Sequence, residues 1–195
     1  MKNYRKRGVF GQVANQLMIL CGFVGLMWAI ESVDFLLGGS LRQFGIVPRQ
    51  WIGLRGIVFA PFLHLIFTHL IANSVPFLCL GWLVMLRRTS DFYVVTPMVM
   101  LIGGLGTWLI ASPNTVHIGA SGLVFGYLGF LLSRGYFERS FVSILLSLAI
   151  GFIYGGLLWG VLPGQSGISW QGHLCGFIGG VLMARWLSVK KGRAR

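Results

Sequence analysis

Six long apolar runs dominate the sequence and restrict the folds open to it. They occupy residues 14–37, 66–86, 92–111, 120–133, 141–162 and 171–189. A helix needs about 20 apolar residues to cross a hydrocarbon core of about 30 Å. The mean hydropathy of +0.78 and the 10% charged residues exclude an ordinary soluble domain. We therefore predict an all-α integral membrane protein with six transmembrane helices.

The six runs leave space for a single domain. We predict a basic cytoplasmic N-terminus over residues 1–13, the membrane domain over 14–189 and a basic cytoplasmic tail over 190–195. The basic stretch before the first run is typical of a signal peptide. However, no small-residue cleavage site leads into a soluble domain, so the first run is predicted to stay as a helix.

The net charge of +12 comes from basic residues that gather on one predicted side of the membrane. Thirteen of the 16 basic residues fall on one predicted side: Lys2, Arg5, Lys6, Arg7, Arg87, Arg88, Arg134, Arg139, Arg185, Lys190, Lys191, Arg193 and Arg195. By the positive-inside rule, both termini are cytoplasmic and the protein lies in the cell membrane. The tail is predicted to contact anionic lipid headgroups, and nucleic acid is the poorer interpretation of the charge.

The fourth run is too short to cross the membrane. From Ser121 to Arg134 there are 13 residues, about 20 Å of helix against the roughly 30 Å required. If Arg134 marks the inner surface, residues 112–120 must enter the membrane without being helical. Such backbone is tolerated only where protein buries it or where it lines a water-filled cavity. We therefore predict that the fourth helix starts inside the membrane and that Ser121 faces water.

Three further polar residues are predicted at the depth of Ser121. Asn73 lies 14 residues from Arg87 and His173 lies 12 residues from Arg185, so each stands about 18–21 Å from the inner boundary. His69 lies one turn from Asn73 on the same helical face. Polar groups inside a membrane are costly and are candidates for function.

These residues fit a serine hydrolase. Ser121 is the candidate nucleophile and His173 the candidate base of a minimal dyad. A helix that begins at Ser121 favours negative charge at its first amides. His69 and Asn73 could donate to the oxyanion. Glycine and serine are also common in ordinary transmembrane packing, but the matched depths and the short helix favour a catalytic role.

Other intramembrane proteases fit less well, and no metal or cofactor is predicted. A zinc protease would carry HExxH, yet neither Glu31 nor Glu138 adjoins a histidine. An aspartyl dyad needs two facing carboxylates, whereas Asp34 and Asp91 lie at span ends on opposite sides. Glu31 is the only conceivable third member of a triad, and we interpret it as structural.

Three segments resemble the motifs of the rhomboid intramembrane serine proteases, of the compact six-span bacterial type. They are "HLIAN" at 69–73, "HIGASG" at 117–122 and "GHLCGFIGG" at 172–180. The resemblance extends from about residue 44 to residue 186. It differs at Gly172, where the family usually has alanine before the histidine.

The resemblance implies a rhomboid-like bundle and a role for each motif residue. Ser121 would be the nucleophile and His173 the general base. His69, Asn73 and the Ser121 amide would stabilise the oxyanion, and Gly119 would shape the turn. The implied partners are single-pass membrane protein substrates, cleaved in or near the transmembrane segment, and membrane lipids. The sequence indicates no oligomeric state.

Two alternatives stay open. A channel or transporter would also contain a polar cavity, although the inner halves of the second, fourth and sixth runs are almost wholly apolar. A proteolytically inactive relative could act as a binding scaffold, although Ser121 and His173 are both present. His64 and His117 are interpreted as structural.

Overall fold

The computed structural model describes residues 8–165 and 167–192, and all regular elements within them are helical. The α-helices are α1 (Val9–Leu36), α2 (Gly56–Phe59), α3 (Phe67–Met85), α4 (Thr89–Ile110), α5 (Ser121–Glu138), α6 (Phe141–Tyr154) and α7 (Trp170–Gly192). The 3-10 helices are η1 (Ser40–Phe44), η2 (Trp51–Arg55), η3 (Ala60–Phe62) and η4 (Gly155–Val161). The prediction of an all-helical fold is confirmed. The predicted terminal segments, 1–13 and 190–195, lie partly outside the described residues.

Within the part of the chain that the structure describes, five helices are long and apolar enough to cross a membrane: α1, α3, α4, α6 continued by η4, and α7. The sixth predicted span, at α5, is not among them. α5 has 18 residues and ends in the charged stretch that contains Arg134 and Glu138. It extends beyond Arg134, which the sequence analysis took as its boundary. The structure thus supports a bundle with five candidate spans, and the sixth span stays a prediction.

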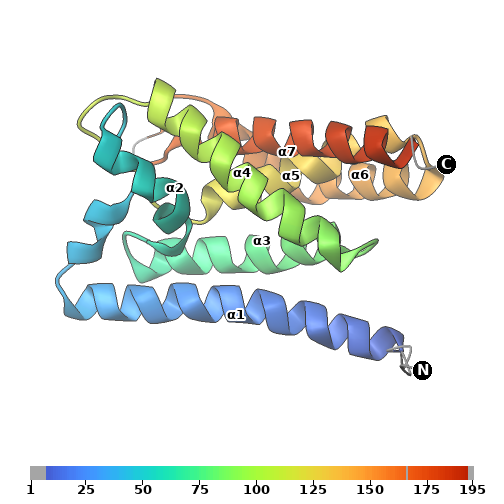
Figure 1. The fold of residues 1–195 in the computed structure, drawn as a ribbon, viewed down its shortest axis with the longest axis horizontal. Helices are drawn as coiled ribbons and strands as arrows, with labels where there is room; N and C mark the ends of the chain where they lie inside the picture. The colour runs from blue at the N-terminus through green and yellow to red at the C-terminus, as the bar shows by residue number, and fades with distance from the viewer. Residues whose placement is uncertain (1–7, 166, 193–195) are drawn as a thin grey trace, which may run out of the picture.

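α5 is the central helix of the bundle. It packs against α3, α4, α6 and α7, and every residue from Leu123 to Leu131 is buried. A helix that is apolar on all sides belongs in an interior. Figure 1 shows α5 and α6 beside α7, while α1 lies at the opposite side of the molecule along α3. The helix that begins at Ser121 is therefore enclosed by four other helices.

Glycines bring the backbones of α5 and α7 into direct contact. A Cβ atom added to Gly180 would overlap the carbonyl oxygen of Gly126, and one added to Gly176 would overlap that of Gly122. Small residues permit such approach where helices associate in a membrane. The contact places the start of α5 against the start of α7.

The segment before α5 is held by the long loop between α1 and α3. Ile46 and His117 exchange two backbone hydrogen bonds of 2.9 Å in an isolated antiparallel bridge. The Gly119 amide donates to the Ala60 carbonyl at 2.8 Å, and the Arg49 guanidinium donates to the Ala111 carbonyl at 2.8 Å. The non-helical backbone predicted for residues 112–120 is therefore hydrogen-bonded to protein, as burial requires.

The close α5–α7 contact predicts that a single methyl group added at Gly180 destabilises the fold. Gly180→Ala must push two backbones apart, because the nearest atom is a carbonyl oxygen that cannot rotate away. We expect it to lower the free energy of unfolding by about 1–3 kcal/mol, measured by denaturant titration in micelles. Gly22→Ala in α1, with nothing within 4 Å of the added atom, is the control and should be neutral or slightly stabilising, because alanine favours a helix more than glycine does. Equal stability of the two variants would contradict the contact.

Candidate active site

Ser121 is the first residue of α5 and follows a turn that only glycine adopts easily. Gly119 has φ +118°, a region that side chains with a Cβ rarely enter. A Cβ atom there would lie 2.9 Å from His69 Cε1, 3.1 Å from His69 Nε2 and 3.7 Å from Ser121 Oγ. The structure thus brings Gly119, Ser121 and His69 together at one point.

His173 is buried in α7 and its ring is fixed from two sides. Its Nδ1 lies 2.9 Å from the Gly160 carbonyl oxygen. Because a carbonyl only accepts, Nδ1 carries the proton and Nε2 is the basic nitrogen. The ring also stacks on Phe125, with centroids 4.0 Å apart and planes 9° from parallel. Phe125 lies one helical turn after Ser121, so α5 supports the ring directly.

Ser121 and His173 lie on facing segments but are not hydrogen-bonded. A Cβ atom added to Gly122 would lie 3.6 Å from the Gly172 carbonyl oxygen. Gly122 follows Ser121 and Gly172 precedes His173, so both candidate catalytic residues adjoin the α5–α7 contact. The structure shows no hydrogen bond between the two side chains. In enzymes without substrate, the nucleophile–base bond is often long and tightens on binding.

The proposed oxyanion donors differ in how free they are. Asn73 is buried, and its Nδ2 donates to the His69 carbonyl at 3.0 Å within α3. One of its two amide hydrogens is therefore engaged. The Ser121 and Gly122 backbone amides, at the start of α5, have no acceptor among the described residues, as expected for a helix N-terminus. These amides are available to an anion.

His64 has a closer relation to the site than the sequence indicated. It is 1% exposed, and its Nε2 accepts from the Ala120 amide at 3.4 Å, one residue before Ser121. Burial, and to a smaller extent the nearby His69, lower the pKa of His64 to about 4, so the ring is neutral at physiological pH. The sequence feature that could have indicated this role is the short distance of five residues between His64 and His69.

Ser169 was missed by the sequence analysis. Its hydroxyl accepts from the Gly172 amide at 3.3 Å and therefore caps α7, and it lies 2.6 Å from His117 Nδ1. The other ring nitrogen of His117 lies 2.8 Å from the Thr115 hydroxyl. This chain of contacts joins the segment before Ser121 to the start of the helix that carries His173. A serine just before an apolar helix is the usual N-cap signal.

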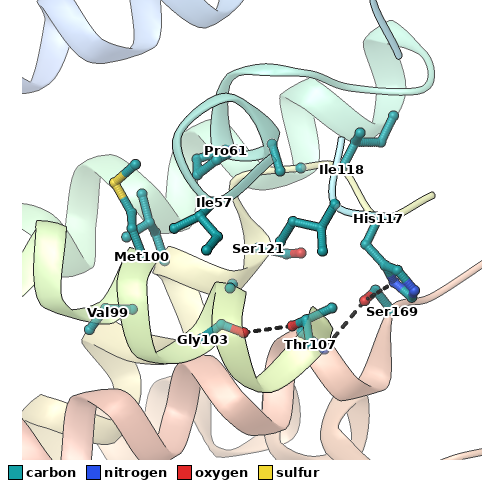
Figure 2. Close-up of a pocket in the computed structure, with 17 residues that line it drawn as sticks. Ile57, Pro61, Val99, Met100, Gly103, Thr107, His117, Ile118, Ser121 and Ser169 are labelled. Atoms are coloured by element: carbon teal, nitrogen blue, oxygen red, sulfur yellow. Dashed lines mark hydrogen bonds between the residues drawn. The ribbon is translucent and has the colours of Figure 1, made fainter. Parts of the chain in front are cut away.

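A small cavity lies beside Ser121 (Figure 2). Its volume is about 50 Å³, more than the roughly 10–15 Å³ that a water molecule needs. Its wall is formed by α4, the long loop, the segment before α5 and the start of α7. His69, Asn73 and His173 do not line it, so it lies on the α4 side of the hydroxyl. This cavity therefore reaches Ser121 from the side of α4.

The cap at Ser169 explains the glycine at position 172 and predicts a coupled pair of substitutions. A Cβ on Gly172 would lie 2.9 Å from Ser169 Oγ. Ser169→Ala alone should cost about 0.5–2 kcal/mol through the lost cap, and Gly172→Ala should also destabilise. The double variant removes the atom that clashes, so it should be more stable than the sum of the single effects, by about 0.5 kcal/mol or more.

Thermal and denaturant unfolding of all four proteins measure this coupling. The structure would be contradicted if the two effects simply added, because Gly172 would then not contact the Ser169 hydroxyl.

Comparison with known proteins connects this geometry to one family. Residues 48–190 match the model of the Rhomboid domain. The chain is 46% identical to the uncharacterized protein Rv1337 of Mycobacterium tuberculosis over 89% of this chain and 75% of that protein. It is 43% identical to the uncharacterized protein ML1171 of Mycobacterium leprae over 99% of this chain and 78% of that one. It is also 32% identical to the putative rhomboid protease YdcA of Bacillus subtilis, with 78% and 75% covered.

Proposed function

The chain belongs to the rhomboid family, and from this we propose that it is an intramembrane serine endopeptidase with Ser121 as nucleophile and His173 as general base. The observation that carries the proposal is the α5–α7 contact. Gly122, which follows Ser121, and Gly172, which precedes His173, face each other in this contact, and the Nδ1 proton of His173 is held by the Gly160 carbonyl. The resemblance to the family's three motifs supports the same assignment.

The proposed reaction is acyl transfer to the serine. As Ser121 Oγ attacks the scissile carbonyl carbon, His173 Nε2 takes the hydroxyl proton. The imidazolium then gives this proton to the leaving amine, and water hydrolyses the acyl-enzyme. The Gly160 carbonyl stabilises the imidazolium through Nδ1–H, in the place where many serine proteases have a carboxylate. The Phe125 ring of α5 holds the plane of the imidazole by stacking on it.

The proposed oxyanion site combines backbone and side-chain donors. The free Ser121 amide lies at the positive end of α5, where developing negative charge is stabilised. His69 lies beside Gly119 and can donate from its ring. Asn73 has one amide hydrogen left after its bond to the His69 carbonyl, and that hydrogen can contribute.

We further propose that α5 is the sixth membrane helix and that both termini are cytoplasmic in the cell membrane. Its 18 residues give about 27 Å of helix, slightly less than a hydrocarbon core. Its first residue would then lie inside the outer boundary. Substrates would be single-pass membrane proteins whose chain is cut in or near the transmembrane segment, since the site opens within the bundle.

The nucleophile is tested by labelling with a fluorophosphonate serine probe. Ser121→Ala should abolish labelling, and His173→Ala should reduce cleavage of a transmembrane substrate toward background, as loss of the histidine costs about 10⁶-fold in a serine protease triad. Ser133→Ala, at the other end of the same helix, should keep full labelling. Undiminished cleavage by the Ser121 variant would refute the dyad.

The oxyanion donors should affect turnover more than binding, because they act on charge that develops in the transition state. We expect His69→Ala and Asn73→Ala each to lower kcat by up to about 10²- to 10³-fold with smaller changes in KM. The double variant should fall toward background, whereas a small probe should still label Ser121. Loss of labelling in either folded single variant would instead assign that residue to positioning of the nucleophile.

A further inference from the structure

A charged cavity lies at the end of the bundle remote from Ser121, where the turn between α3 and α4 meets the ends of α5 and α7 (to the right in Figure 1). Its volume is about 250 Å³. Four basic and two acidic side chains line it: Arg87, Arg88, Arg134, Lys190, Asp91 and Glu138. The proposed protease chemistry uses none of them.

The two carboxylates of this cavity are already neutralised. The Arg134 guanidinium lies 3.1 Å from Asp91 and 3.0 Å from Glu138, and Arg87 also pairs with Glu138. Arg134, Asp91 and Glu138 are largely buried, so these pairs are structural. Paired and unpaired groups together leave the cavity with a net charge of +2.

Two exposed cations of the cavity have no carboxylate partner among the described residues. Arg88 precedes α4, and Lys190 lies near the end of α7. The Arg guanidinium suits bidentate contact with phosphate oxygens, and the Lys ammonium adds a compact charge. An anion entering the cavity would find two free cations at its wall.

The surface of α7 next to Lys190 is apolar. The Lys190 ammonium lies 4.9 Å from the centre of the Trp186 ring, and Trp186 and Val189 are each about half exposed. Trp is enriched where a membrane helix meets the headgroup layer. A ligand that combines an anionic group with acyl chains would therefore contact both parts of this surface, whereas a free anion would use only the first.

We propose that this cavity binds the phosphodiester headgroup of an anionic phospholipid, with Arg88 and Lys190 on the phosphate and the acyl chains along the Trp186 face of α7. The proposal is independent of the protease activity. It differs from the general attraction of basic tails to a membrane because it requires a defined pair of cations next to a defined apolar face.

The test is native mass spectrometry of the full chain released from nanodiscs with equal phosphatidylglycerol and phosphatidylcholine. The wild type should retain phosphatidylglycerol preferentially. Arg88→Gln with Lys190→Gln should reduce this preference about 5-fold for each cation removed. Arg139→Gln with Arg185→Gln removes the same charge from exposed positions that do not line the cavity, and should reduce the preference clearly less than the cavity variant does.

Three results would overturn the proposal. One is equal loss in both double variants, which would indicate bulk surface charge. Another is a wild type that does not prefer phosphatidylglycerol. The third is inorganic phosphate that displaces the bound lipid completely at millimolar concentration, which would make this an anion site without a role for the acyl chains.

Discussion

The contact between α5 and α7 is the constraint on which the rest of the structure depends. Glycine at positions 176 and 180 removes Cβ atoms that would overlap the facing backbone of α5. In a membrane, helices gain little from burying apolar surface against one another, because lipid is equally apolar, so close packing must supply the attraction. The same packing fixes where α5 begins relative to α7, and it thereby fixes the geometry of the candidate dyad.

The start of α5 is held by several weak contacts rather than by one strong bond. The long loop binds the preceding backbone at Ala60 and Ile46, His64 accepts from the Ala120 amide, and Ser169 connects His117 to α7. Three of the partners lie at different points of the long loop, and the fourth, Ser169, directly precedes α7. Preorganised donors are effective because they need no rearrangement at the moment of reaction, and distributed support of this kind provides that rigidity.

Much of this arrangement could be predicted from sequence, for identifiable reasons. The apolar run that begins at residue 120 predicted a helix start close to Ser121, and α5 does start there. The sequence could not give the end of α5, because Arg134 is buried in ion pairs with Asp91 and Glu138 and so does not mark the surface. The Asn73 bond to the His69 carbonyl and the Ser169 cap depend on side-chain torsions, which spacing does not determine.

Polar groups that remain unpaired in the interior lower the stability of the fold. His64 Nδ1 and Glu31 Oε2 are buried without a hydrogen-bond partner within the described part of the chain, and the first amides of α5 are also free. Each such group costs stability in a low-dielectric interior. A bundle without such a site could carry apolar side chains at His64 and Glu31. His64 and the free amides lie at the start of α5 beside Ser121, where the amides are available for the negative charge that develops on a substrate carbonyl in the proposed reaction.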